Sequence, residues 1–148
     1  MNIDQFKAID VAQREQKPKL FSLSTPAACA NPEMLNEVEG LLGVVLPSKY
    51  REFLTAFGGG DFGLVNVFSA DKKNEWYLCY KLEELHDTLP QGYLPFSDDN
   101  AGGYYVLKVQ NGEVKDRVFY WNYEEQDLRE TPFSDILEFV ARYAYEPA

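Results

Sequence analysis

Residues 46–60, LPSKYREFLTAFGGG, contain the strongest structural signal in the chain. The apolar residues Tyr50, Phe53, Leu54 and Phe57 recur at i, i+3, i+4 and i+7, which places them on one face of a helix that starts at Pro47. Three consecutive glycines then end the helix, because glycine adopts positive φ without a steric penalty. The stretch therefore predicts an amphipathic helix whose aromatic face lies against the core.

Two more helices are predicted on the N-terminal side of this stretch. Asn31 and Pro32 form an N-cap followed by proline at the first helical position, and Gly43 ends that helix. Its expected apolar face consists of Leu35, Val38, Leu41 and Leu42. The third helix covers residues 2–13, and the segment that follows it is a loose arm. We therefore divide the chain into an N-terminal helix and arm, residues 1–30, and a domain, residues 31–148.

After the glycines the sequence becomes rich in aromatic and β-branched residues. These predict strands at 62–68, 75–80, 104–109 and 117–121, with a short helix at 82–89 between them. Asn111-Gly112 is a hairpin signal between the last two strands, and we expect the connection to be longer than two residues, with a bulge or a wider loop. A last helix opens near Thr131, with Phe133, Ile136, Leu137 and Val140 on its apolar face. This order predicts a single-domain α+β fold.

The charge balance restricts the classes of partner. Fourteen basic and 24 acidic residues give a net charge of −10, which opposes binding to nucleic acid or to an anionic membrane surface and favours a basic partner. The same acidity is equally consistent with a role in solubility alone. The sequence shows neither an apolar run of membrane-spanning length nor a secretory signal, so we expect a cytoplasmic protein in which Cys29 and Cys79 are free thiols.

No motif in the sequence predicts a cofactor, a metal centre or an active site. Residues 58–63 match G-x-G-x-x-G, but they follow a predicted helix, whereas a dinucleotide site needs this string between a strand and a helix. Residues 98–103 begin like a calcium loop but lack its later ligands, so we interpret them as a turn capped by Asp and Asn side chains. His86, the single histidine, is expected to be a solvated helix residue.

Four blocks of residues, taken together, resemble the Smi/Knr-type domains of the SUKH superfamily. Residues 46–60 resemble its L-P-x-x-Y-x-x-F-L…G-G signature, and residues 94–105 resemble its F-x-x-D-x-x-G-x-x-Y block. Residues 118–121 resemble its V-Y-x-W/F strand, and residues 131–140 resemble its closing S-F-x-x-F-L helix. The resemblance covers residues 31–145. It implies a central, mostly antiparallel sheet surrounded by helices and a non-enzymatic role. Bacterial members are widely immunity proteins that neutralise a polymorphic toxin, often a nuclease, and fungal relatives regulate cell-wall synthesis.

The expected partner-binding residues are carboxylates near an aromatic strand end. Two acidic groups, around residues 98–99 and 124–130, form one surface if both lie at the same end of the sheet. Such a surface is a solvated loop, a carboxylate pair for acid–base chemistry, or a recognition patch for a basic protein. The resemblance favours the patch on an immunity protein that binds its cognate toxin. A regulatory scaffold and a small hydrolase remain the alternatives. The residues expected to contact the partner are Asp98, Asp99, Trp121, Glu124, Glu125 and Asp127.

Overall fold

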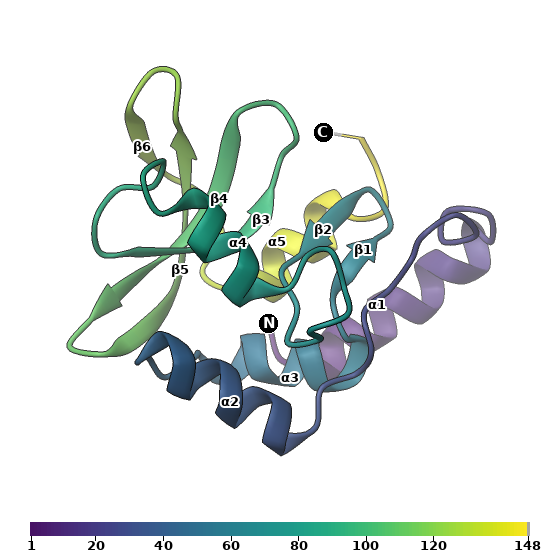
Figure 1. The fold of residues 1–148 in the computed structure, drawn as a ribbon. Helices are drawn as coiled ribbons and strands as arrows, with labels where there is room; N and C mark the ends of the chain where they lie inside the picture. Colours follow the sequence, from purple (N-terminus) through teal and green to yellow (C-terminus); the bar gives the residue numbers. More distant parts are fainter. Residues whose placement is uncertain (148) are drawn as a thin grey trace.

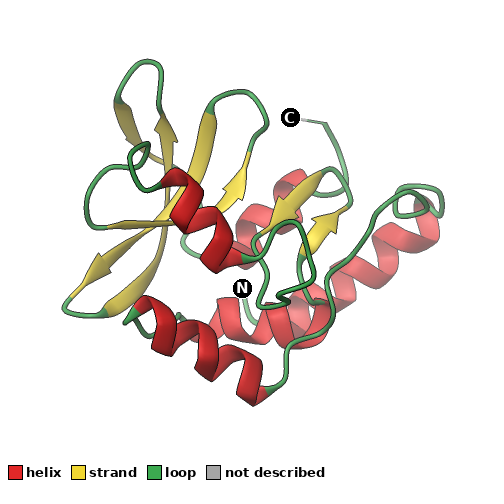
Figure 2. Cartoon of the chain, viewed as in Figure 1, coloured by secondary structure: helices red, strands yellow, loops and turns green. Residues whose placement is uncertain are grey.

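The computed structural model describes residues 1–147, which form a mixed α+β domain (Figures 1 and 2). The helices are α1 (Ile3–Gln16), α2 (Pro32–Leu42), α3 (Ser48–Phe57), α4 (Leu78–Leu85) and α5 (Ile136–Tyr143). The strands are β1 (Gly60–Phe62), β2 (Val65–Val67), β3 (Tyr93–Asp98), β4 (Gly103–Gln110), β5 (Glu113–Asn122) and β6 (Asp127–Glu130). The predicted α+β class is confirmed.

The main sheet is an antiparallel meander of four strands in the order β3-β4-β5-β6, and β1 and β2 form a separate hairpin. Helix α5 covers one face of the sheet, where the Phe139 ring lies 5.2 Å from that of Phe96 on β3. The segment after α4 covers part of the other face, where the Trp121 indole N–H donates to the Thr88 carbonyl at 2.8 Å. Aromatic side chains thus occupy both faces of the meander.

The core is centred on the aromatic face of α3, as the sequence predicts. Tyr50, Phe53 and Leu54 are fully buried, and the Tyr50 hydroxyl donates to the Phe68 carbonyl at 2.7 Å. Phe57 is partly buried against the same cluster. Gly58, Gly59 and Gly60 all have φ between +74° and +82°, and Gly58 ends the helix in the left-handed conformation.

Helix α2 is also confirmed, with one error in its apolar face. The Asn31 side chain accepts a hydrogen bond from the backbone N–H of Met34, and Gly43 ends the helix in the left-handed conformation. Leu35 and Val38 are buried and Leu42 packs against the core, but Leu41 is 65% exposed. Leu41 is exposed because successive residues of a helix are rotated by about 100°, which places Leu41 roughly 120° around the helix from the buried Leu35.

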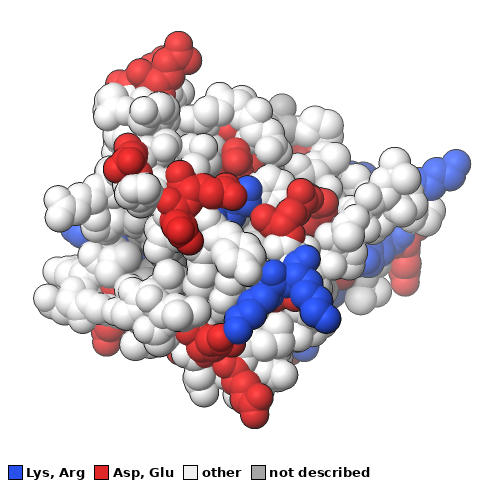
Figure 3. All heavy atoms as spheres, in the orientation of Figure 1, with Lys and Arg blue, Asp and Glu red and all other residues white. Residues whose placement is uncertain are grey.

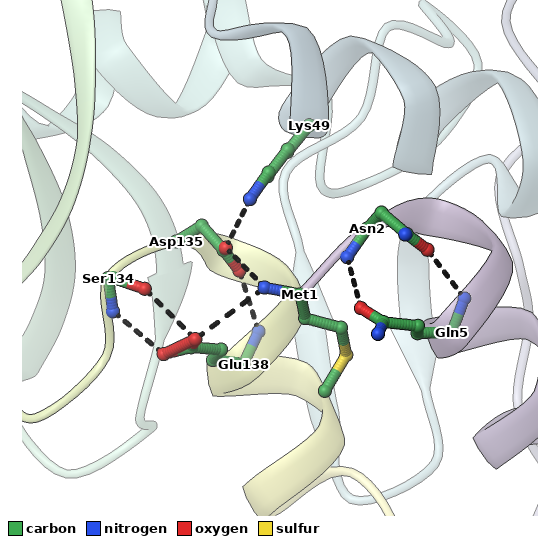
Figure 4. A network of polar contacts seen from close by, with 7 residues as sticks. All are labelled: Met1, Asn2, Gln5, Lys49, Ser134, Asp135 and Glu138. Atoms are coloured by element: carbon green, nitrogen blue, oxygen red, sulfur yellow. Dashed lines mark hydrogen bonds and ion pairs between the residues drawn. The ribbon is translucent and has the colours of Figure 1, made fainter.

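The N-terminal helix packs onto the domain. Phe6 of α1 is fully buried, and its ring lies 5.7 Å from that of Phe53. A polar network then connects the start of α1 to α3 and α5 (Figure 4). At its centre Asp135, the N-cap of α5, accepts hydrogen bonds from Lys49 Nζ at 2.8 Å, the Met1 amino group at 3.3 Å and the Glu138 backbone N–H at 2.9 Å. Three segments far apart in sequence are therefore joined at one carboxylate.

The predicted strand at 75–80 is wrong, and the predicted helix at 82–89 begins too late. Asn74 Oδ1 accepts a hydrogen bond from the Trp76 backbone N–H at 2.9 Å, so the chain turns where a strand was expected. Helix α4 then begins at Leu78. The aromatic residues that indicate a strand pack against the core instead. Tyr77 is 2% exposed, and the Trp76 ring stacks on that of Phe68.

Three other boundaries differ from the sequence prediction. Residues 62–68 hold a turn and β2 rather than one strand, because Gly63 adopts a φ of +55° and the chain reverses. The β4–β5 connection has only two residues, Asn111 and Gly112, both with positive φ, and the bulge lies within the strands instead. The last helix begins at Ile136, because Asp135 supplies the N-cap rather than Thr131.

Candidate functional site

Two acidic loops lie next to each other at one end of the four-stranded sheet. The β3–β4 loop covers residues 99–102, and the β5–β6 turn covers residues 123–126. Gly103 pairs with Asn122, and the Tyr123 backbone N–H donates to the Gly102 carbonyl at 3.2 Å. The meander thereby brings the two predicted acidic groups to the same end of the sheet. We call Asp98, Asp99, Glu124, Glu125 and Asp127 the acidic end. In Figure 3, red spheres cover the β5–β6 turn at the top left.

The β3–β4 loop is shaped by its own carboxylates. Asp98 Oδ1 accepts a hydrogen bond from the Asn100 backbone N–H at 2.7 Å. Asp99 Oδ1 accepts from Ala101 N at 2.7 Å and from Gly103 N at 2.8 Å, while Asp99 Oδ2 accepts from the Tyr120 hydroxyl at 2.5 Å. These bonds confirm the interpretation of residues 98–103 as a turn capped by aspartate side chains.

The negative charges of the acidic end are only partly balanced. Arg129 on β6 forms ion pairs with Asp127 and, at 3.3 Å, with Glu125. Within residues 1–147, by contrast, Asp98, Asp99 and Glu124 have no ion-pair partner. Within residues 1–147, the five carboxylates of the acidic end therefore have one guanidinium as their ion-pair partner, which leaves a local excess of negative charge.

This excess charge also affects the tyrosines beside it. Burial, reinforced by the hydrogen bond to Asp99 and by its charge, raises the pKa of the Tyr120 hydroxyl to about 12. Burial likewise raises the pKa of Tyr104, with further contributions from the charges of Asp98 and Asp99. Both hydroxyls are therefore protonated at neutral pH, so Tyr120 donates to Asp99 and holds the β3–β4 loop against β5.

Trp121 differs in position from the other predicted partner-binding residues. Its side chain is 7% exposed, and its indole N–H is used by the Thr88 carbonyl. It lies on the face of β5 opposite to Tyr120, because side chains alternate along a strand. The structure thus places Trp121 beneath the segment that follows α4, where it supports the sheet, and the carboxylates form the accessible part of the predicted set.

A pocket of about 380 Å³ lies beside the acidic end, between the β3–β4 loop, the β1–β2 turn and α5. Its aromatic wall consists of Tyr105, Phe139 and Tyr143, and Asp98, Asp99 and Glu146 also line it. Sequence reasoning predicts the two aspartates but none of the other residues. No local pattern identifies them, because they come from a strand interior, the last helix and the C-terminal segment.

Comparison with known families places the chain in a described group. A family model described as SUKH_6, SMI1-KNR4 cell-wall, matches residues 32–140. The matched range runs from the start of α2 into α5 and includes the acidic end. No curated protein matches the sequence. Among residues 1–147, no helix combines the length and apolar character needed to cross a membrane.

Proposed function

The chain belongs to the SUKH_6 (SMI1-KNR4) family, a Smi/Knr-type group of the SUKH superfamily, and from this premise we propose that it is an immunity protein that binds and neutralises a cognate protein toxin. Membership in the family is consistent with an immunity role and with a cell-wall-regulator-like role. The observation that favours toxin binding is the acidic end, where Asp98, Asp99 and Glu124 have no cationic partner among residues 1–147.

The proposed mechanism is stoichiometric binding without catalysis. A toxin that acts on nucleic acid carries basic residues around its active site, and a surface with excess carboxylates is complementary to them. Long-range attraction speeds the encounter, and a few desolvated charge pairs then slow dissociation. The bound acidic end covers or distorts the active site of the toxin, so each immunity molecule inactivates one toxin molecule.

Exposed apolar side chains near the acidic end support a protein partner. Tyr123, in the β5–β6 turn, is 47% exposed, and Leu64, in the β1–β2 turn, is 52% exposed. Leu64 also lines the pocket together with Asp98 and Asp99. Apolar and aromatic residues inside a charged rim are the usual composition of a protein–protein interface. We place the encounter in the cytoplasm, a reducing compartment that suits the exposed free thiol of Cys29.

The proposal is tested by a protection assay in living cells. The product of the neighbouring gene, as the candidate toxin, is expressed together with the wild-type chain or with the double variant Glu124→Lys/Glu125→Lys. The matched control, Glu33→Lys/Glu52→Lys, makes the same change in net charge at exposed positions on α2 and α3. We expect survival with the wild type and the control, and loss of protection with the double variant.

Two results would count against parts of this proposal. A harmless neighbouring product that still binds the chain at the acidic end would favour the regulatory scaffold, the second candidate, which the cell-wall description of the family also supports. Equal protection by the wild type and the Glu124→Lys/Glu125→Lys variant would show that the acidic end is the wrong surface. In that case the next surface to test is α4, with Glu83 and Glu84.

A further inference from the structure

We propose that the pocket beside the acidic end receives an arginine side chain of the protein partner, an inference that rests on the proposed function and assigns it a specific anchor. The pocket has a volume of about 380 Å³, ample for one long side chain. It combines a wall of aromatic rings with carboxylates, which is the combination that a cationic side chain requires.

The aromatic wall is a continuous group of rings. The Tyr105 and Phe139 ring centroids lie 4.4 Å apart, those of Phe139 and Tyr143 lie 5.5 Å apart, and those of Tyr105 and Tyr143 lie 6.0 Å apart. A cation over such rings is attracted by the negative charge of their faces. The planar guanidinium also stacks on aromatic rings and is more weakly hydrated than an ammonium group, so arginine fits this wall better than lysine.

The carboxylates of the pocket supply the complementary charge. Asp98 uses Oδ1 for its own loop, and within residues 1–147 its other oxygen, Oδ2, has no donor and the residue no ion pair. Both oxygens of Asp99 accept hydrogen bonds from neutral groups, so its charge is likewise not balanced by a cation. Glu146 is the exception, because it pairs with Lys17 at 3.3 Å. A guanidinium in the pocket would therefore meet two uncompensated aspartates.

The surroundings of the pocket indicate that the arginine belongs to a protein. A second, smaller pocket of about 230 Å³ shares Leu64, Val65 and Asn100 with the first, so the two form one continuous surface. Leu23, which lines the second pocket, is 95% exposed, and Leu64, between the two, is 52% exposed. A free arginine is too small to cover these apolar side chains as well as fill the pocket. A folded protein that carries the arginine on its surface would cover them.

The test uses N-acetyl-arginine methylamide as a probe and NMR chemical shifts of the isotope-labelled full chain as the readout. N-acetyl-citrulline methylamide is the control ligand, because it has nearly the same shape and no charge. Asp98→Asn removes one pocket charge and keeps the oxygen that caps the loop. Glu33→Gln is the matched variant, since it removes the same charge at an exposed position on α2, outside the pocket lining and outside the acidic end.

We expect saturable shifts at residues 97–100, 105 and 139–146 with the arginine probe, and none with the citrulline control. Asp98→Asn should weaken probe binding about tenfold, the effect of losing one hydrogen bond to a charged group, whereas Glu33→Gln should change it less than twofold. Shifts of equal size with both probes, or equal affinity of Asp98→Asn and the wild type, would overturn the arginine assignment.

Failure of this inference is distinguishable from failure of the proposed function. If Asp98→Asn protects cells from the toxin as well as the wild type does, while Glu124→Lys/Glu125→Lys does not, the partner binds the acidic end without using the pocket. If the pocket binds the arginine probe with the expected specificity but the neighbouring gene product is harmless, the arginine site is supported and the immunity role is contradicted.

Discussion

At the scale of single residues, the aspartates of this protein have two distinct roles that follow from their surroundings. Asp135 is 1% exposed and accepts three hydrogen bonds, two of them from cationic groups, so its charge is fully used inside the fold. Asp98 has no cationic partner within residues 1–147, so its charge remains available to another molecule. The same residue type is thus structural in one place and suited to binding in the other.

Asp135→Asn is predicted to lower the free energy of unfolding at pH 7 by roughly 2 kcal/mol, because bonds between charged groups are lost. Burial alone would raise the pKa of Asp135, but the Lys49 bond, the Glu138 N–H and nearby positive charges outweigh it and hold the pKa below its ordinary value. A lowered pKa means that the stabilisation is present above about pH 4 and disappears as the pH falls further. Urea unfolding at several pH values measures this.

Asp116→Asn is the control, because we expect it to change the free energy of unfolding in the opposite direction to Asp135→Asn. Among residues 1–147, Asp116 Oδ1 is buried without a hydrogen-bond partner, and burial raises the pKa of this carboxyl group despite the opposing effect of Lys49. Its negative charge is therefore unfavourable in the folded state, and removing it should stabilise the protein at pH 7, with the gain vanishing at low pH, where the wild-type carboxyl is protonated. If both variants lost stability equally at every pH, the electrostatic explanation of the network would be wrong.

At the scale of elements, local patterns predict the structure wherever local interactions determine it. The i, i+3, i+4, i+7 face of α3, the Asn31 cap of α2 and the Asn111-Gly112 turn are all visible in sequence, because each depends on residues close together. β3, β6 and the start of α4 are not. The Trp76 region has strand-like composition, but the chain turns there because the Trp76 backbone N–H donates a hydrogen bond to Asn74 Oδ1. β3 and β6 are ordered by pairing with β4 and β5.

Gly58→Ala is predicted to destabilise the fold by at least about 2 kcal/mol, through backbone strain combined with overpacking. Gly58 has a φ of +82°, and a Cβ atom there would lie 2.1 Å from the Ala27 carbonyl oxygen. Gly40→Ala, in the last turn of α2, is the matched control, since no atom of residues 1–147 lies within 4 Å of its Cβ position, and it should stabilise by about 0.5–1 kcal/mol. Similar urea midpoints for the two variants would contradict this account of the triple glycine.

At the scale of the whole molecule, topology assembles the candidate site. Asp98 and Glu124 are predicted from sequence as acidic residues near strand ends, but their meeting at one end of the sheet depends on the β3-β4-β5-β6 meander. The pocket was beyond prediction from sequence, because Leu64, Tyr105, Tyr143 and Glu146 come from four separate segments. Trp121 is predicted from its residue type to contact the partner. In the structure it is buried, and its indole N–H donates to the Thr88 carbonyl.

The central claim, that the acidic end binds a basic protein toxin, is tested most directly by the association rate of the purified chain with the neighbouring gene product at increasing ionic strength. For the wild type we predict a fast rate that falls steeply with salt, because long-range attraction drives the encounter. For Glu124→Lys/Glu125→Lys we predict a rate about tenfold lower at low salt and a flatter dependence, whereas Glu33→Lys/Glu52→Lys should remain close to the wild type. An association rate and salt dependence that the reversal at Glu124 and Glu125 leaves unchanged would contradict the claim.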